Sequence, residues 1–406
     1  MTGTSLPRPI ELASGLPLAR RVDGIAGEGS KAWAVHSRAR RMEEAGEDVI
    51  VLSIGDPDFD TPAPIVDAAI DALRGGRTHY SAARGIEPLR RAIAGHYGTI
   101  AGIDVDPEQV IAVNGGQAAL FVSLMCVTDP GDRVIVLEPA YPTYGPAIGA
   151  TGGQMVSVAL NSERDFRLDP ADIEAAIDGS TRALLINFPH NPTGTTLCQR
   201  DIDGLAELCR RHDLWLISDE VYADLIFDGR HLSPAAHPDL ADRTIVIGSF
   251  SKSHAMCGWR LGWVMAPGDL AGHLGRMVEC VFFGGVPFIQ DAAVVALTGP
   301  QTETAAMRAA FQARRDRVVA AVNAMSGLSC QAPAAGMFLM IDSRGTGLSA
   351  PDFANRLLDQ TGVALLPADA FGRSAAGFLR LSLSAPEAKL EEACDRIARF
   401  VAGLNR

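Results

Sequence analysis

The sequence predicts an α/β fold: a large domain with a mostly parallel sheet of seven strands between helices, and a smaller α+β domain. Two observations indicate this fold class. From about residue 110 to residue 265, short runs rich in Val, Ile and Leu alternate with segments of helical pattern, which is typical of βαβ crossovers. The runs are continuously apolar, which is typical of parallel strands buried on both faces.

The predicted elements of the large domain follow one another along the chain. The strands are residues 109–113, 132–138, 153–160, 183–188, 214–220, 243–250 and 261–266. Residues 118–127 and 199–212 have the pattern of helices between them. Sheets of this kind bind their ligands beyond the carboxyl ends of the strands, so polar residues at those ends are the first candidates for a site.

The pattern changes after about residue 300. Residues 303–325 form a long amphipathic helical pattern, and strand-like segments follow at 336–342 and 378–384 before a last helix at 386–404. We therefore predict three parts. They are an N-terminal arm with part of the small domain in residues 1–60, the large domain in residues 61–299, and the small C-terminal domain in residues 300–406.

Composition excludes several classes of partner. Apolar residues make up 47% of the chain and charged residues 21%, as expected for a globular interior. The net charge of −12 repels phosphate backbones, so we expect no nucleic acid partner. No apolar run reaches the roughly 18 residues that cross a bilayer, so we expect no membrane association.

The cysteines indicate a reducing compartment. All seven are isolated, without a Cys-x-x-Cys pair, which favours the cytoplasm and predicts no metal site. Prolines interrupt the first 24 residues, which argues against a signal peptide. Cys257 is expected to be a small packing residue.

Polar residues follow several predicted strands and should meet at one edge of the sheet. Taken singly, each has a structural alternative: Asp219 could cap a helix, Asn191 could shape a turn, and Gly115 could serve a tight turn. Together they suit one ring that carries a phosphate tail. The residues are Gly115, Gly116, Gln117, Asn191, Asp219, Tyr222, Ser249, Ser251, Lys252 and Arg260.

Lys252 is one of three lysines in a chain that uses arginine for its other positive charges. A desolvated lysine amine is neutral part of the time and can form a Schiff base with an aldehyde, whereas arginine cannot because it stays protonated. A carboxylate such as Asp219 would keep a pyridine nitrogen protonated and make the ring an electron sink. Ser249, Arg260 and the amides near Gly116 suit a phosphate. These requirements describe pyridoxal 5′-phosphate.

Separated motifs extend this interpretation over nearly the whole chain. They are "LSIGDPDFDTP", "THYSAARGIEPLR", "EPAYPTYG", "NPTG", "SDEVY", "SFSKSHAMCGWRLGW" and "FLRLSLS". In this order they resemble the class I aminotransferases of pyridoxal-phosphate fold type I. The resemblance implies a ping-pong transfer of an amino group from an amino acid to a 2-oxo acid.

The resemblance also implies a role for each motif residue. Lys252 would hold the cofactor aldehyde and shuttle a proton, and Asp219 would pair with the pyridine nitrogen. Asn191 and Tyr222 would hold the phenolic oxygen, and Tyr141 would stack on the ring. The phosphate would be held by Gly115, Gly116, Gln117, Ser249, Ser251 and Arg260.

The resemblance also assigns a residue to the substrate carboxylate and another to the contact with a partner subunit. Arg380, in "FLRLSLS", would clamp the substrate carboxylate with the help of Asn191 and the Gly55 backbone. Tyr80, in "THYSAARG", would reach the phosphate of a partner subunit, so the resemblance implies a homodimer with shared active sites.

The substrate side chain is less constrained. Aspartate-specific members carry a basic residue near the double-glycine motifs, but "CVFFGGVP" has none and Gln117 follows Gly115-Gly116, so a non-dicarboxylic donor is favoured. The segments "GEGSKAWAVHSRA" and "ISDEVYADLIFDG" also resemble bacterial arginine–pyruvate transaminases. Glu28 and Asp58 are candidate acidic partners for a guanidinium, although each could be an ordinary surface charge.

Other functions use the same residues. An aspartate or aromatic aminotransferase, or a carbon–sulfur β-lyase of the same fold, would need the same lysine. A cofactor-binding regulator would need a basic helix-turn-helix extension, which the N-terminal residues do not offer. A catalytically silent structural protein would not need Lys252, Asp219 and Arg380 together.

Overall fold

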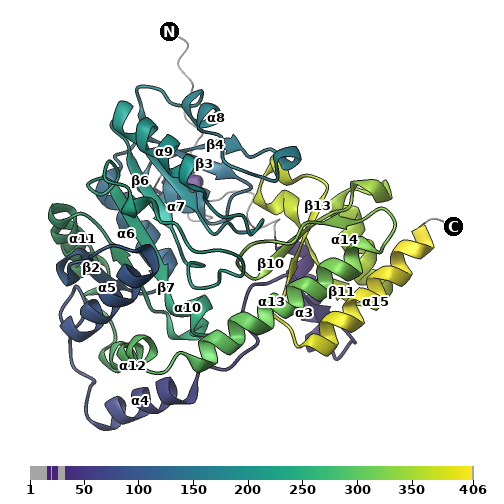
Figure 1. The fold of residues 1–406 in the computed structure, drawn as a ribbon, viewed down its shortest axis with the longest axis horizontal. Coiled ribbons are helices and arrows are strands. Elements are labelled where there is room, and N and C mark those ends of the chain that lie inside the picture. The colour runs from purple at the N-terminus through teal and green to yellow at the C-terminus, as the bar shows by residue number, and fades with distance from the viewer. Residues whose placement is uncertain (1–15, 20, 26–32, 405–406) are drawn as a thin grey trace.

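The fold is known from a computed structural model that describes residues 16–19, 21–25 and 33–404. Its main sheet has seven strands, as predicted (Figure 1). Their spatial order is β2 (Val110–Val113), β8 (Gly262–Met265), β7 (Thr244–Ser249), β6 (Trp215–Asp219), β5 (Thr181–Asn187), β3 (Arg133–Glu138) and β4 (Gln154–Ala159). All neighbours pair in parallel except β8, which is antiparallel to β2 and β7. The predicted mostly parallel α/β sheet is confirmed.

Helices cover both faces of this sheet. One face packs against α6 (Gly116–Val127), α7 (Tyr144–Thr151) and α11 (Gly268–Phe282). The other face has two groups of helices. At one end of the sheet lie α8 (Pro170–Glu174) and α9 (Gln199–Arg211). At the other end lie α4 (Ala63–Arg74), α5 (Glu87–Ala101) and α12 (Pro287–Thr298). In β5, Ala183 and Leu185 face the first layer whereas Leu184 and Ile186 face the second, so the strand is buried on both faces.

Burial on both faces does not extend to every strand. The edge strand β4 is exposed along most of its length, and Met155 is 37% exposed. An edge strand has a neighbour on one side only, so its apolar residues are only partly covered. The prediction of a strand at residues 153–160 is confirmed, but that of full burial is wrong.

The second unit is built on a four-stranded antiparallel sheet. It consists of β12 (Leu366–Pro367), β13 (Phe378–Ser382), β10 (Phe338–Asp342) and β9 (Ser329–Cys330). Helices α13 (Thr302–Asn323), α14 (Ala350–Thr361) and α15 (Glu387–Leu404) pack around it in one apolar core.

Part of the N-terminal region belongs to this second unit. Strand β1 (Ile50–Val51) pairs in parallel with β11 (Val363–Ala364), and α3 (Ala34–Glu44) lies beside the C-terminal helices (Figure 1). These contacts support the proposed division at about residues 60 and 300. The short helix α1 (Arg21–Ile25) packs near α7, and most of the predicted N-terminal arm lies outside the described residues. Within the described part of the chain, no helix has the length and apolar character to span a membrane.

Candidate active site

A cavity of about 480 Å³ lies where the carboxyl ends of the central strands of the large sheet meet the second unit. Strands β5, β6 and β7 deliver side chains from one side, and β10 and β13 deliver Phe338 and Arg380 from the other. The structure brings together most of the residues predicted from the sequence. The cavity is lined by Gly55, Gly116, Gln117, Tyr141, Asn191, Asp219, Tyr222, Ser249, Ser251, Lys252, Arg260 and Arg380.

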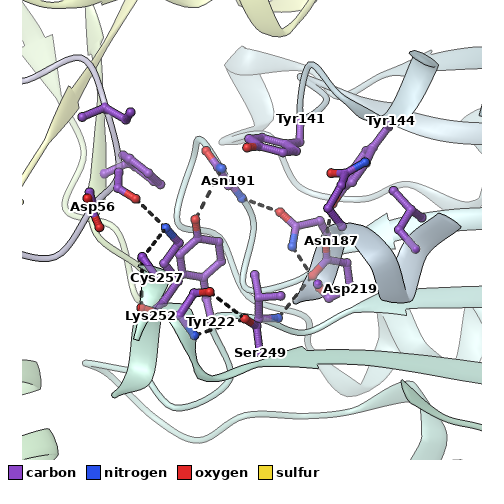
Figure 2. A pocket seen from close by; sticks show the side chains of 18 of the residues that line it. Asp56, Tyr141, Tyr144, Asn187, Asn191, Asp219, Tyr222, Ser249, Lys252 and Cys257 are labelled. Carbon is purple, nitrogen blue, oxygen red and sulfur yellow. Dashed lines mark hydrogen bonds between the residues drawn. The ribbon is translucent and has the colours of Figure 1, made fainter. Parts of the chain in front are cut away.

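Asp219 ends β6 at one end of the cavity (Figure 2). The Tyr144 hydroxyl donates a hydrogen bond of 2.6 Å to its Oδ2, and the Asn187 side-chain amide donates to its backbone carbonyl at 2.9 Å. Burial raises the pKa of Asp219 to about 6, against the hydrogen bond from Tyr144, which lowers it. A buried carboxylate in this position suits a protonated ring nitrogen, because the positive charge would offset its desolvation.

A second part of the cavity is a cradle for an anion. Helix α6 begins at Gly116, two residues earlier than predicted, because Gly115 has a φ of +87° and turns the chain into the helix. A Cβ at Gly115 would lie 2.4 Å from Nη2 of Arg260, so glycine keeps this corner open. The Ser249 and Ser251 hydroxyls lie 3.0 Å apart nearby. Free helix-start amides, two hydroxyls and a guanidinium fit a phosphate group.

Lys252 lies on the short helix α10 (Phe250–Ser253), directly after β7. Its Nζ donates to the carbonyl of Gly55 and lies 3.5 Å from Sγ of Cys257 (Figure 2). Burial raises the pKa of the Cys257 thiol, which keeps it in the neutral form. Cys257 therefore borders the reactive lysine, rather than only filling space as the sequence suggested.

Asn191 and Tyr222 form the wall between Asp219 and Lys252. The Asn191 amide lies 3.5 Å from the Tyr222 hydroxyl, and both side chains are buried. Burial raises the pKa of Tyr222, so its hydroxyl is a donor at neutral pH. The pair can donate to an oxygen that lies between the two ends of the cavity.

Arg380 is 1% exposed and carries a charge that no carboxylate balances within the described residues. One Nη donates to Oδ1 of Asn191 at 3.2 Å and the other to the carbonyl of Ser53 at 2.8 Å, whereas Nε has no partner. The guanidinium stacks on Phe338 and Phe371, and burial lowers its pKa to about 10. A buried cation with an unused donor requires an incoming anion.

One candidate from the sequence, Asp58, lies outside the cavity lining, and the roles of Gly55, Tyr80 and Glu28 stay predictions. The carbonyl that contacts Arg380 belongs to Ser53, whereas that of Gly55 contacts Lys252. Asp58 does not line the cavity, because its carboxylate binds Arg314 at 2.6 Å. Tyr80 is 87% exposed and lies away from the cavity of its own chain. Glu28 lies outside the described residues.

Sequence reasoning missed several lining residues. Tyr144 is the last tyrosine of the motif "EPAYPTYG", and no local pattern there predicts its contact with Asp219. Asn187 is the polar residue inside the apolar strand run "ALLIN", which is a usable signal. The remaining missed residues are Trp33, His36, Ile54, Asp56, Leu120, Val221 and Phe338.

The fold and the cavity define an enzyme of pyridoxal-phosphate fold type I. A carboxylate at one end, a lysine toward the other end and a phosphate cradle beside them fit this cofactor, and the open corner at Gly115 leaves room for its phosphate. The sequence profile described as aminotransferase class I and II matches residues 47–397, and the chain belongs to this family.

Relatives and solved structures agree with this assignment. The chain is 50% identical over 380 residues to an arginine–pyruvate transaminase of Pseudomonas aeruginosa, covering 94% of this chain and 97% of the relative. It is 38% identical over 389 residues to an aspartate/prephenate aminotransferase of Cereibacter sphaeroides, covering 93% and 97%. The crystal structure of an aspartate aminotransferase from Rhizobium meliloti matches with a TM-score of 0.90 at 34% identity, covering 96% of this chain and 99% of that one. The predicted class is confirmed: this is an aminotransferase that uses pyridoxal 5′-phosphate.

Proposed function

We propose that this aminotransferase takes its amino group from arginine or another non-dicarboxylic amino acid and passes it to a 2-oxo acid such as pyruvate. The observation that carries the substrate class is the buried, uncompensated Arg380. Amino acid and 2-oxo acid share one feature, a carboxylate next to the reacting carbon, and a planar guanidinium binds a carboxylate through two parallel hydrogen bonds. One clamp therefore serves both half-reactions.

The charges of the cavity support a donor without a second carboxylate. Besides Arg380, the cations among its described lining residues are Lys252 and Arg260, which have roles at the reacting carbon and the phosphate. Burial lowers the pKa of His36, and Arg40 and Arg380 lower it further, so this side chain is neutral at pH 7. No cation in this lining is left to pair with a second carboxylate. The arginine–pyruvate transaminase that is 50% identical supports arginine as the donor.

The residues have separate tasks in the proposed mechanism. Pyridoxal 5′-phosphate supplies, when bound, an electron-withdrawing ring that stabilises negative charge at the substrate α-carbon. The Lys252 amine, freed when the substrate amine replaces it, would take the proton from the α-carbon and return it to the cofactor carbon that carried the aldehyde. Asp219 holds the ring nitrogen, and Arg380 holds the carboxylate so that the α-carbon faces the lysine.

We also propose that the active unit is a homodimer. Tyr80 is 87% exposed and packs edge-to-face on Phe283, which is 60% exposed, and Val281 and Val286 are exposed nearby in sequence. Large apolar side chains exposed together favour a protein–protein contact. This arrangement supports a role for Tyr80 in the phosphate site of the partner. The seven free cysteines support the proposed cytoplasmic location.

A half-reaction tests the proposed function. Arginine added to the holoenzyme without a 2-oxo acid should give one equivalent of the corresponding oxo acid per active site and then stop, and pyruvate should restart it. Continuous release of ammonia and pyruvate from a sulfur amino acid without acceptor would instead show a β-lyase. A faster half-reaction with aspartate than with arginine would contradict the proposed donor.

A further inference from the structure

We propose that Asp56 recognises the positively charged side chain of the amino donor; this inference rests on the proposed use of arginine. Asp56 lines the cavity and lies at the end opposite Asp219, on the side of Lys252 and Cys257 (Figure 2). The substrate amine would have to replace Lys252 at the aldehyde carbon of the cofactor, so the substrate α-carbon would lie close to Lys252. The substrate side chain therefore starts at the same end of the cavity as Asp56.

Asp56 is the cavity carboxylate that has no charged partner: it contacts the Cys257 thiol, whose pKa it helps to raise, and no lysine or arginine of the described chain. The cavity contains two carboxylates among its described lining residues, and Asp219 is already bonded by Tyr144. Asp56 is exposed and forms no ion pair with a lysine or arginine of the described chain. A guanidinium would meet a carboxylate whose negative charge is not paired, and it could bind that carboxylate through two parallel hydrogen bonds in place of the weaker contact with the thiol.

One short segment connects the carboxylate clamp with Asp56. The carbonyl of Ser53 accepts from Arg380, that of Gly55 accepts from Lys252, and Asp56 comes next. Three residues of extended chain span at most about 10 Å, and the six bonds between the carboxylate carbon and the guanidinium carbon of arginine span roughly 7 Å. An arginine held at Arg380 thus has the length to reach a carboxylate three residues further along this segment.

The loop after Asp56 is fixed to the rest of the protein. Asp58 binds Arg314 through two hydrogen bonds, of 2.6 and 3.0 Å. Thr61 donates to the carbonyl of Ala255 and accepts from the indole of Trp259. A recognition group held on such an anchored loop loses little conformational freedom when the substrate binds. Asp56, rather than the sequence candidate Asp58, lines the cavity on this anchored loop.

The test compares two donors of equal shape. L-citrulline replaces the guanidinium of arginine by a neutral ureido group, so the ratio of kcat/KM for arginine to that for citrulline reports recognition of the charge. The holoenzyme, Asp56→Asn and Asp60→Asn would be assayed with pyruvate as acceptor. Asp60 lies on the same loop but outside the cavity lining, so its variant is the matched control.

The expected result is a loss of discrimination in one variant only. The unchanged enzyme and Asp60→Asn should prefer arginine by roughly 10- to 100-fold, as for one charge-assisted contact, and Asp56→Asn should use both donors about equally. Its kcat/KM for citrulline should stay near that of the unchanged enzyme, which shows that Lys252 still works.

Other results would overturn the inference in distinguishable ways. A preference for arginine that survives in Asp56→Asn refutes the role of Asp56 and leaves the proposed function intact. An equal loss with both donors shows that Asp56 acts on the Lys252 and Cys257 end of the cavity instead. An unchanged enzyme that does not accept arginine refutes the proposed donor itself, and the inference with it.

Discussion

Asp219→Asn should make the cofactor-free protein more stable above pH 6 while it removes most of the activity of the holoenzyme. Burial raises the pKa of Asp219 from 3.8 to about 6, so the folded protein favours the protonated carboxyl. A carboxyl group whose pKa is higher in the folded than in the unfolded protein favours folding while it is protonated. This contribution is complete below the unfolded pKa of 3.8 and is lost as the pH rises to about 6. Asparagine keeps the shape of the side chain without the charge.

The magnitude follows from the size of the shift. About two pKa units at 1.36 kcal/mol each give up to about 3 kcal/mol at pH 8. Asp219 borders the open cavity, and water there screens part of the penalty, so we expect about 2 kcal/mol. Bound cofactor would remove the penalty in the unchanged enzyme, since Asp219 would pair with its protonated ring nitrogen.

Urea unfolding of the cofactor-free proteins at pH 5 and pH 8 measures this difference. Relative to the unchanged protein, Asp219→Asn should gain about 1 kcal/mol of unfolding free energy between the two pH values, because about half of the penalty is already present at pH 5, above the unfolded pKa of 3.8. The exposed Asp60→Asn should show no such gain. If the difference in unfolding free energy between Asp219→Asn and the unchanged protein is the same at both pH values, the claim that Asp219 is held in a desolvated site is refuted. The holoenzyme variant should lose about 100-fold or more in kcat.

Three further changes test other parts of the site. Arg380→Leu should lower kcat/KM about 100-fold or more for amino acid and 2-oxo acid alike, because both lose two charge-assisted hydrogen bonds; steady-state kinetics that show a loss with only one of them would contradict the shared clamp. Tyr144→Phe removes the donor that lowers the pKa of Asp219, so the acid limb of cofactor binding should move to higher pH, and an unmoved limb would show that this hydrogen bond does not matter. Asp58→Asn weakens a largely buried ion pair with Arg314 and should lower the unfolding free energy by about 2 kcal/mol, whereas a loss no larger than that of Asp60→Asn would mark the pair as a surface contact.

The residues at the strand ends could be predicted from the sequence. Asn191, Asp219 and Lys252 follow buried apolar runs, and the carboxyl ends of parallel strands meet at one edge, so their proximity could be predicted without tertiary information. The antiparallel direction of β8 follows from the length of the segment before it. Only residues 250–261 separate it from β7, with no helix long enough for a crossover, so the strand returns antiparallel.

Other contacts depend on packing that no local pattern records. Tyr144 reaches Asp219 because the first turn of α7 lies over the end of β6, and this placement follows from the whole helical layer. Asp56 and Asp58 are two residues apart in a loop with a proline between them. Because neither the helical nor the strand period applies there, the sequence could not show which carboxylate faces the cavity. Arg314, which binds Asp58, lies more than 250 residues away in the chain.

The most direct test of the account is to locate the bond between protein and cofactor. Borohydride reduction of the holoenzyme, proteolysis and mass spectrometry would assign the modified residue among only three lysines, Lys31, Lys252 and Lys389. We predict the cofactor mass on Lys252 alone, and no trapped cofactor in Lys252→Ala. Modification of Lys31 or Lys389 in the unchanged enzyme, or equal trapping in the variant, would contradict the assignment of Lys252 as the catalytic lysine.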